Sequence, residues 1–186
     1  QIPMVIEEQL QIAVQGLVFI PIFVGGVHVW GAGVKAIGRH IGPGNRPLDP
    51  VVTGTQVDAK LGEVATQGRT VDYINAHGTS TPAGDMIELK GIKEVFGENV
   101  PPISSTKSLT GHSLGATGVQ EAVYSLLMME NNFMVESANI STLDEQAEGM
   151  NILRENKNDV TINSILSNSF GFGGTNASIY ITSYND

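Results

Sequence analysis

From residue 71 onward, the sequence alternates short apolar segments typical of buried strands with longer segments of helical periodicity. Strands are predicted over residues 71–75, 162–166 and 177–182, and a further strand and turn over residues 103–111. Strands that alternate with helices predict an α/β fold, in which a largely buried sheet carries helices on both faces.

Two helices are predicted between these strands. Asp85 lies three residues before Glu88, which is the spacing of an N-cap and its reciprocal acid, and Gly97 marks the end of this first helix. The second helix has apolar residues at the i, i+3, i+4 spacing of a single helical face: Val119, Ala122, Val123, Leu126 and Leu127.

The first 70 residues carry weaker signals. Residues 4–16 have the pattern of a short amphipathic helix followed by a glycine. Residues 17–34 contain Val, Ile, Phe and Trp without any charge, and predict one or two buried strands. Glycine and proline mark a loop over residues 38–70, within which residues 57–65 fit a short helix.

Composition excludes several classes of function. The 10 Lys and Arg against 19 Asp and Glu give a formal net charge of −9, which argues against nucleic acid because phosphate binding needs clustered basic residues. The apolar run from Leu17 to Val29 is shorter than the roughly 20 residues of a membrane-spanning helix, and nothing flanks it as in a signal peptide. We therefore expect a cytoplasmic chain without a membrane partner.

The chain has no cysteine. This excludes a disulfide framework, a thiolate metal site and a cysteine nucleophile on this polypeptide. At 186 residues and 41% hydrophobic composition, the chain is nevertheless large enough to form one domain with a real core.

Three glycine-containing turns each follow a predicted strand, where α/β folds place their functional sites. They are His-Gly-Thr-Ser-Thr-Pro-Ala-Gly-Asp at 77–85, Ser-Thr-Lys-Ser-Leu-Thr-Gly-His-Ser-Leu-Gly-Ala at 105–116, and Asn-Ser-Phe-Gly-Phe-Gly-Gly-Thr-Asn at 168–176. Taken singly, a turn histidine is more often structural than catalytic, and a Gly-Phe-Gly-Gly run is usually a tight turn.

Taken together, the three turns resemble in order and type those of the β-ketoacyl-acyl-carrier-protein synthases, the condensing enzymes of fatty-acid synthesis, and most closely their synthase I branch. The resemblance is strong over residues 71–183, and it fails over residues 36–70. It implies that residues 1–186 form a single domain, the C-terminal half of a thiolase-like α/β fold with a mixed sheet and helices on both faces.

The resemblance implies a decarboxylating condensation. A cysteine thiolate takes an acyl group from a carrier thioester, malonyl thioester loses carbon dioxide, and the resulting carbanion attacks the acyl-enzyme. Decarboxylation leaves negative charge on the thioester oxygen, which two hydrogen-bond donors stabilise, and His77 and His112 match that pair. Lys107 matches a buried lysine whose charge holds a carboxylate, for which Glu88 is the matching position.

Four further residues match substrate-contacting positions of the family. Phe172 matches the residue whose backbone N–H joins the acyl-enzyme oxyanion hole and whose ring gates the acyl pocket; Phe170 is its neighbour, or plain core. Thr79 and Thr81 match hydroxyls that contact the phosphopantetheine arm of the acyl carrier protein, or else cap the turn. Asp85 is assigned to helix capping. No metal and no resident cofactor are expected.

The resemblance covers only half of a family member, and therefore implies partners. These are an N-terminal half that carries the cysteine, the acyl carrier protein, and a second copy in a homodimer of the intact enzyme. Two alternatives stay open: a non-catalytic, cysteine-less partner subunit of a condensing enzyme, or an altered coding sequence that folds poorly, which the unrecognisable residues 36–70 favour.

Overall fold

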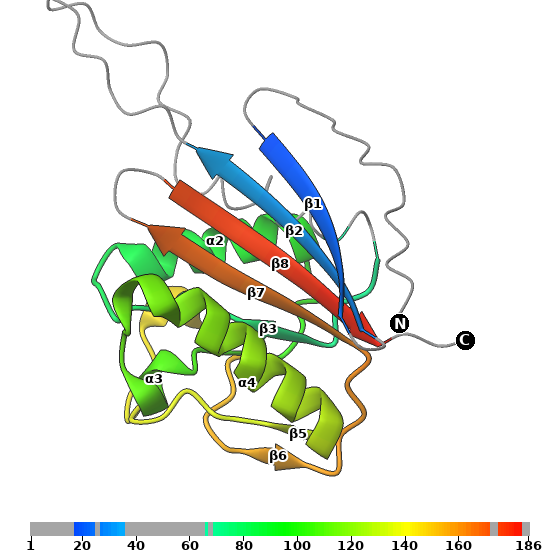
Figure 1. Ribbon diagram of the computed structural model, residues 1–186. Helices are drawn as coiled ribbons and strands as arrows, with labels where there is room; N and C mark the ends of the chain where they lie inside the picture. Colours follow the sequence, from blue (N-terminus) through cyan, green and yellow to red (C-terminus); the bar gives the residue numbers. More distant parts are fainter. Residues whose placement is uncertain (1–16, 25–26, 36–65, 67–68, 172–174, 184–186) are drawn as a thin grey trace, which may run out of the picture.

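The computed structural model describes residues 17–24, 27–35, 66, 69–171 and 175–183 (Figure 1). The strands are β1 (Leu17–Val24), β2 (Val27–Lys35), β3 (Tyr73–Asn75), β4 (Ile103–Ser104), β5 (Phe133–Met134), β6 (Lys157–Asn158), β7 (Ser164–Gly171) and β8 (Thr175–Ser183). The helices are α2 (Gly84–Phe96), α3 (Lys107–Thr110) and α4 (Thr117–Asn131), with short 3₁₀ turns η1 (Leu114–Ala116) and η2 (Glu145–Ala147).

Six strands form one mixed sheet in the order β1-β2-β8-β7-β3-β4. The pairs β1–β2, β2–β8 and β8–β7 are antiparallel, whereas β3 pairs in parallel with both β7 and β4. Because β3, β4 and β7 run in the same direction, their carboxyl ends meet at one edge of the sheet. The first two predicted turns begin at that edge, and the third predicted motif begins within β7.

Helices cover both faces of this sheet, as predicted (Figure 1). Alternate residues of a strand point to opposite faces, so neighbours in β3 join different cores. Ile74 packs with Ile92 of α2 and Leu166, while Tyr73 packs with Met128 of α4 and Ile165. The sheet therefore separates an α2 core from an α4 core.

The one or two strands predicted within residues 17–34 are two strands in the structure, since β1 pairs with β2 and β2 joins β8 in the same sheet. The predicted helix at residues 4–16 and the segment at residues 57–65 lie outside the described residues. No helix in the described part of the chain is long and apolar enough to cross a membrane.

The first helix was predicted correctly in its extent but not in its cap. Gly97 ends α2 with φ +59°, a left-handed conformation that glycine adopts without strain. The N-cap residue is Ala83, and it makes no side-chain capping bond. Asp85 instead lies in the first turn, where its Oδ1 accepts a hydrogen bond from the Ser80 N–H at 3.1 Å and closes the preceding loop.

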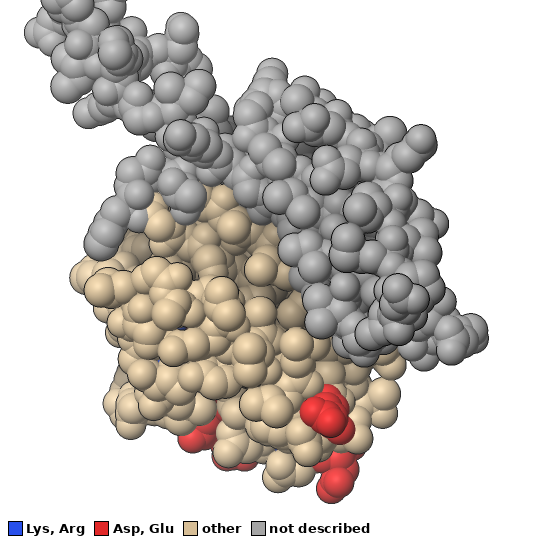
Figure 2. Space-filling model, viewed as in Figure 1, with Lys and Arg blue, Asp and Glu red and all other residues tan. Residues whose placement is uncertain are grey.

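The second helix, α4, has its predicted apolar face on the outside. The residues that it buries are largely polar: Thr117, Glu121, Ser125 and Met128. The large apolar side chains that it exposes are Val119 (71% exposed), Val123 (47%) and Leu127 (45%). On the face seen in Figure 2, the surface over α4 is mainly uncharged, and acidic side chains gather only at its lower edge. Periodicity identified the residues that share a face, but not which face meets the sheet.

The glycine-rich turn predicted from residue 168 begins later in the structure. Asn168 to Gly171 continue β7, paired with β8 up to the Gly171–Thr175 position. The strand and turn predicted over 103–111 are a two-residue strand, β4, followed by the one-turn helix α3.

Candidate active site

His77 lies just beyond the carboxyl end of β3, and a tight turn holds its backbone. Gly78 has φ +35°, and a Cβ at this position would come within 2.8 Å of Ser105 Cβ, so the turn accepts only glycine without rearrangement. The Ser105 hydroxyl donates to the Gly78 carbonyl at 3.1 Å. The turn after β4 thus packs directly against the turn that carries His77.

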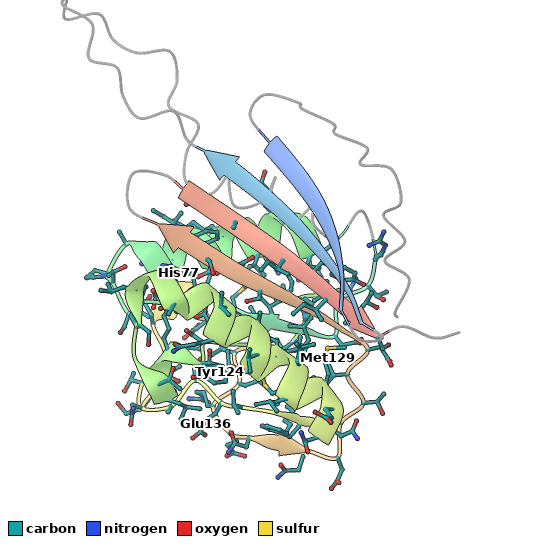
Figure 3. The ribbon with its side chains drawn as sticks, viewed as in Figure 1. His77, Tyr124, Met129 and Glu136 are labelled. Carbon is teal, nitrogen blue, oxygen red and sulfur yellow. The ribbon has the colours of Figure 1, made fainter. Side chains whose placement is uncertain are left out.

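The rings of His77 and His112 lie side by side. Their centroids are 5.7 Å apart and their planes meet at 88°. Phe170 of β7 lies on another side of His77, with a centroid separation of 5.5 Å. Figure 3 shows His77 beside the amino-terminal end of α4, with Met129 toward the other end of that helix. Two turns and strand β7, which are far apart in sequence, therefore meet at His77.

The hydrogen bonds around His112 select one tautomer. Its Nδ1 accepts from the backbone N–H of Leu114 at 3.0 Å and also lies 3.0 Å from the Thr117 hydroxyl. A neutral ring whose Nδ1 accepts must carry its proton on Nε2. His112 can therefore present an Nε2–H donor on the side of the ring away from α4.

His77 is held neutral by its surroundings. Burial, the positive charge of Lys107 and the neighbouring His112 together lower its pKa to about 4, with burial the largest cause. Its Nδ1 is buried and has no hydrogen-bond partner within the described residues. An imidazolium carries a proton on both ring nitrogens, so it would leave the Nδ1–H buried and unpaired. At neutral pH the ring is therefore an uncharged imidazole.

Protonation of His77 should destabilise the fold in mildly acidic solution. Unfolded His77 takes up its proton near pH 6.5 and folded His77 only near pH 4, so the free energy of unfolding falls as the pH drops through that window. Between pH 7 and pH 5 we expect a loss of about 1–2 kcal/mol that is absent in His77→Gln. Urea unfolding of both proteins at the two pH values measures it. An His77 ring that titrates near pH 6.5 by NMR would contradict the assignment.

Lys107 forms a buried ion pair with Glu121 of α4, not with Glu88 as the resemblance implied. Its Nζ contacts Glu121 Oε1, and the two side chains are only 5% and 2% exposed. Glu121 Oε2 also accepts from Ser169 of β7 at 3.4 Å. Burial raises the pKa of Glu121, and the hydrogen bond and charge of Lys107 oppose that rise.

Glu88 is buried against the backbone of the His77 turn. Its Oε1 and Oε2 accept from the N–H groups of His77 and Gly78, each at 2.9 Å. Burial raises the pKa of Glu88, whereas these N–H groups, Asn168 and the charge of Lys107 lower it. Glu88 therefore supports the backbone at His77, while Glu121 takes the direct contact with Lys107.

A cavity of about 680 Å³ is lined by His112 and by Gly78, the neighbour of His77, but not by His77 itself. Thr79 and Thr81 line it, with their hydroxyl oxygens 3.4 Å apart, and so do Lys107, His112 and Glu88. Phe170 is half-buried beside His77 and does not line this cavity. Phe172 lies outside the described residues.

Sequence reasoning missed two buried polar residues at this centre, Glu121 and Asn168. Glu121 lies four residues after Thr117, on the same helical face as Ser125, and this polar stripe was a usable signal within an otherwise apolar helix. Asn168 stood inside the third motif, but nothing in its sequence context indicated a partner 80 residues away.

The mixed sheet between α2 and α4, with histidine-bearing turns at the carboxyl ends of its strands, defines a thiolase-like condensing-enzyme fold. The profile of the family "Beta-ketoacyl synthase, C-terminal domain" matches residues 35–141, more than half of the chain. The chain belongs to this family.

Known proteins agree with that assignment. The chain is 58% identical over 122 residues to 3-oxoacyl-[acyl-carrier-protein] synthase 1 of Haemophilus influenzae, covering 66% of this chain and 30% of that protein. Its structure resembles a β-ketoacyl synthase from Burkholderia phymatum, with a TM-score of 0.70 and 28% identity over 86% of this chain and 38% of the other. It also resembles AntDE:AntF, described as a type II polyketide-synthase acyl-carrier protein in complex with its ketosynthase bound to the hexaketide. That match has a TM-score of 0.69 and 28% identity, and covers 83% of this chain and 38% of the other. The chain thus spans about a third of the length of its relatives.

Proposed function

We propose that this chain is the C-terminal part of a β-ketoacyl-acyl-carrier-protein synthase, which condenses malonyl thioester with an acyl thioester in fatty-acid elongation, with loss of carbon dioxide. The edge-on pairing of a neutral His77 with His112 carries this proposal. Two ring N–H donors that converge on one point can stabilise the oxygen on which negative charge develops during decarboxylation.

Each side chain at the centre has a role in this proposal. His112 donates from Nε2 to the thioester oxygen, and His77 donates beside it as the carbon–carbon bond to carbon dioxide breaks. Lys107 acts through charge, because its proximity lowers the pKa of His77 and keeps that ring a neutral donor. Glu88 holds the His77 backbone, Phe170 packs against the His77 ring, and the Phe172 N–H completes the acyl-enzyme oxyanion hole.

The nucleophile must come from polypeptide outside these 186 residues, because the sequence has no cysteine. The substrates arrive on the phosphopantetheine arm of an acyl carrier protein, for which the cavity lined by Thr79 and Thr81 offers room and hydroxyl contacts. The carrier-protein complex among the similar ketosynthase structures supports this partner.

The apolar stripe on α4 supports an N-terminal half as the partner that supplies the cysteine. Val119, Val123 and Leu127 expose a continuous apolar face, and such a face needs cover in a stable protein. About two thirds of the relatives' length lies outside the matched region, which is enough polypeptide to provide it. The proposed intact enzyme is a cytoplasmic homodimer, as the family resemblance implies.

Reconstitution tests the proposal. When mixed with the cysteine-bearing N-terminal part of the Haemophilus influenzae synthase, the chain should form a 1:1 complex that releases carbon dioxide from malonyl-acyl-carrier protein and yields a β-ketoacyl product, measured by light scattering and mass spectrometry. The chain alone should form no acyl-enzyme. A folded, associated pair that does neither reaction would leave the chain a non-catalytic partner subunit.

A charge on the α4 stripe should break that complex. Val123→Asp should weaken association by roughly tenfold or more, because the interface would have to bury an unpaired carboxylate. The matched control is Lys90→Asp, which adds the same side chain at an exposed position of α2. Equal affinities for the two variants would remove α4 from the interface.

A further inference from the structure

Asn168 is a buried polar residue for which neither the motif nor the proposed chemistry provides a role. It lies on β7, two residues before Phe170, and is 4% exposed. Its Nδ2 donates to Glu88 Oε1 at 3.1 Å, and its Oδ1 accepts from the Ser178 hydroxyl at 2.8 Å. Ser178 is the residue directly opposite it on β8.

Glu88 determines which way the Asn168 amide faces. An ionised Glu88 can only accept, so the Nδ2 end must point at it, and Oδ1 is then held by the Ser178 hydroxyl. The reversed amide would place an oxygen against a carboxylate oxygen and lose the bond to Glu88. The strand pair β7–β8 therefore presents a fixed donor to Glu88.

Glu88 passes this constraint to the His77 turn. Its Oε1 accepts from both Asn168 Nδ2 and the His77 N–H, and its Oε2 accepts from the Gly78 N–H. A continuous chain of hydrogen bonds thus runs from Ser178 through Asn168 and Glu88 to the backbone on which the His77 ring is mounted. Phe170, on the same strand as Asn168, contacts that ring from the other side.

We propose that Asn168 is a positioning residue, which acts through Glu88 to fix the backbone of His77 and Gly78 relative to β7. The His77 ring and Phe170 are thereby held in one geometry. The catalytic meaning of that geometry rests on the function proposed above, but the positioning itself is a property of the folded chain.

Amide hydrogen exchange on the 186-residue chain tests this without any activity assay. Asn168→Leu keeps a side chain of similar size and removes the donor, and Ser178→Ala is a milder change that removes only the hydroxyl donating to Asn168 Oδ1. Protection of the His77 and Gly78 amides should fall by at least tenfold in Asn168→Leu. It should fall by a smaller factor in Ser178→Ala. The amides of β3 and α4 should keep their protection, because strand pairing and helical bonds hold them.

A second readout separates positioning from simple core filling. Without the Asn168 donor, the Glu88 carboxylate loses one stabilising hydrogen bond, so its pKa should rise further in a ¹³C titration. The matched control is Ser164→Ala, which removes a buried hydroxyl from the other end of β7, where it bonds Asp72 and Thr70. That control should leave the His77 and Gly78 amides and the Glu88 pKa as they are in the parent.

The outcomes are decisive in either direction. Selective loss of protection at His77 and Gly78, even if only Ser178→Ala folds well enough to measure, supports the proposal. Protection that is unchanged at these amides, or that falls equally throughout the sheet, overturns it and leaves Asn168 a core residue. Because no step uses substrate, a failure here is distinguishable from a failure of the proposed synthase activity.

Discussion

Lys107→Met lowers the free energy of unfolding by about 3–5 kcal/mol, because it leaves the carboxylate of Glu121 buried without its partner. The double variant Lys107→Met/Glu121→Gln should recover most of that loss, since it removes both charges and keeps a polar group beside Ser169. Urea unfolding followed by circular dichroism, with the denaturant dependence compared among variants, measures both effects.

The exposed pair of Lys93 and Glu98 provides the matched control. Lys93 Nζ lies 3.0 Å from Glu98 Oε1, but the two side chains are 42% and 90% exposed, so water and salt screen their attraction. Lys93→Met should cost less than about 1 kcal/mol. If Lys107→Met costs no more than Lys93→Met, the ion pair is not buried in solution as the structure has it.

His77→Ala and His112→Ala should each slow carbon dioxide release in the reconstituted pair by about a hundredfold to a thousandfold, the usual cost of one oxyanion donor. Because the donors act on the transition state, the loss should fall mainly on kcat rather than on KM. The double variant should be little slower than either single variant, since two donors on one oxygen act as a unit. Steady-state assays with malonyl-acyl-carrier protein give all three values.

Ser113→Ala is the control for these variants, because Ser113 is an exposed neighbour of His112 and lies outside the proposed machinery. It should keep the parent rate. Histidine variants that release carbon dioxide as fast as the parent, in a pair shown to be folded and associated, would make the functional proposal wrong.

The order of the elements after residue 70 could be predicted from the sequence because it depends on local interactions. The periodicity of Val119, Val123 and Leu127 predicted a helix regardless of what covers it, and Gly97 predicted the end of α2 because few residues adopt its φ without strain. The motifs around His77 and His112 predicted the family through their resemblance to its turns, and Gly78 in the first of them fills a position that a side chain would crowd.

Only the tertiary structure decided which partners the functional side chains have. Lys107 contacts Glu121 rather than Glu88 because α4, not α2, passes closest to its ammonium group, and chain spacing carries no such information. The same holds for the neutral state of His77, which arises from burial and from Lys107 and His112, two residues that a separate turn brings beside it. Periodicity likewise grouped the apolar residues of α4. In the structure the polar face of α4 contacts β7, so Val119, Val123 and Leu127 lie on the outside. The spacing of residues in a helix determines which of them share a face, but the tertiary fold determines what that face contacts.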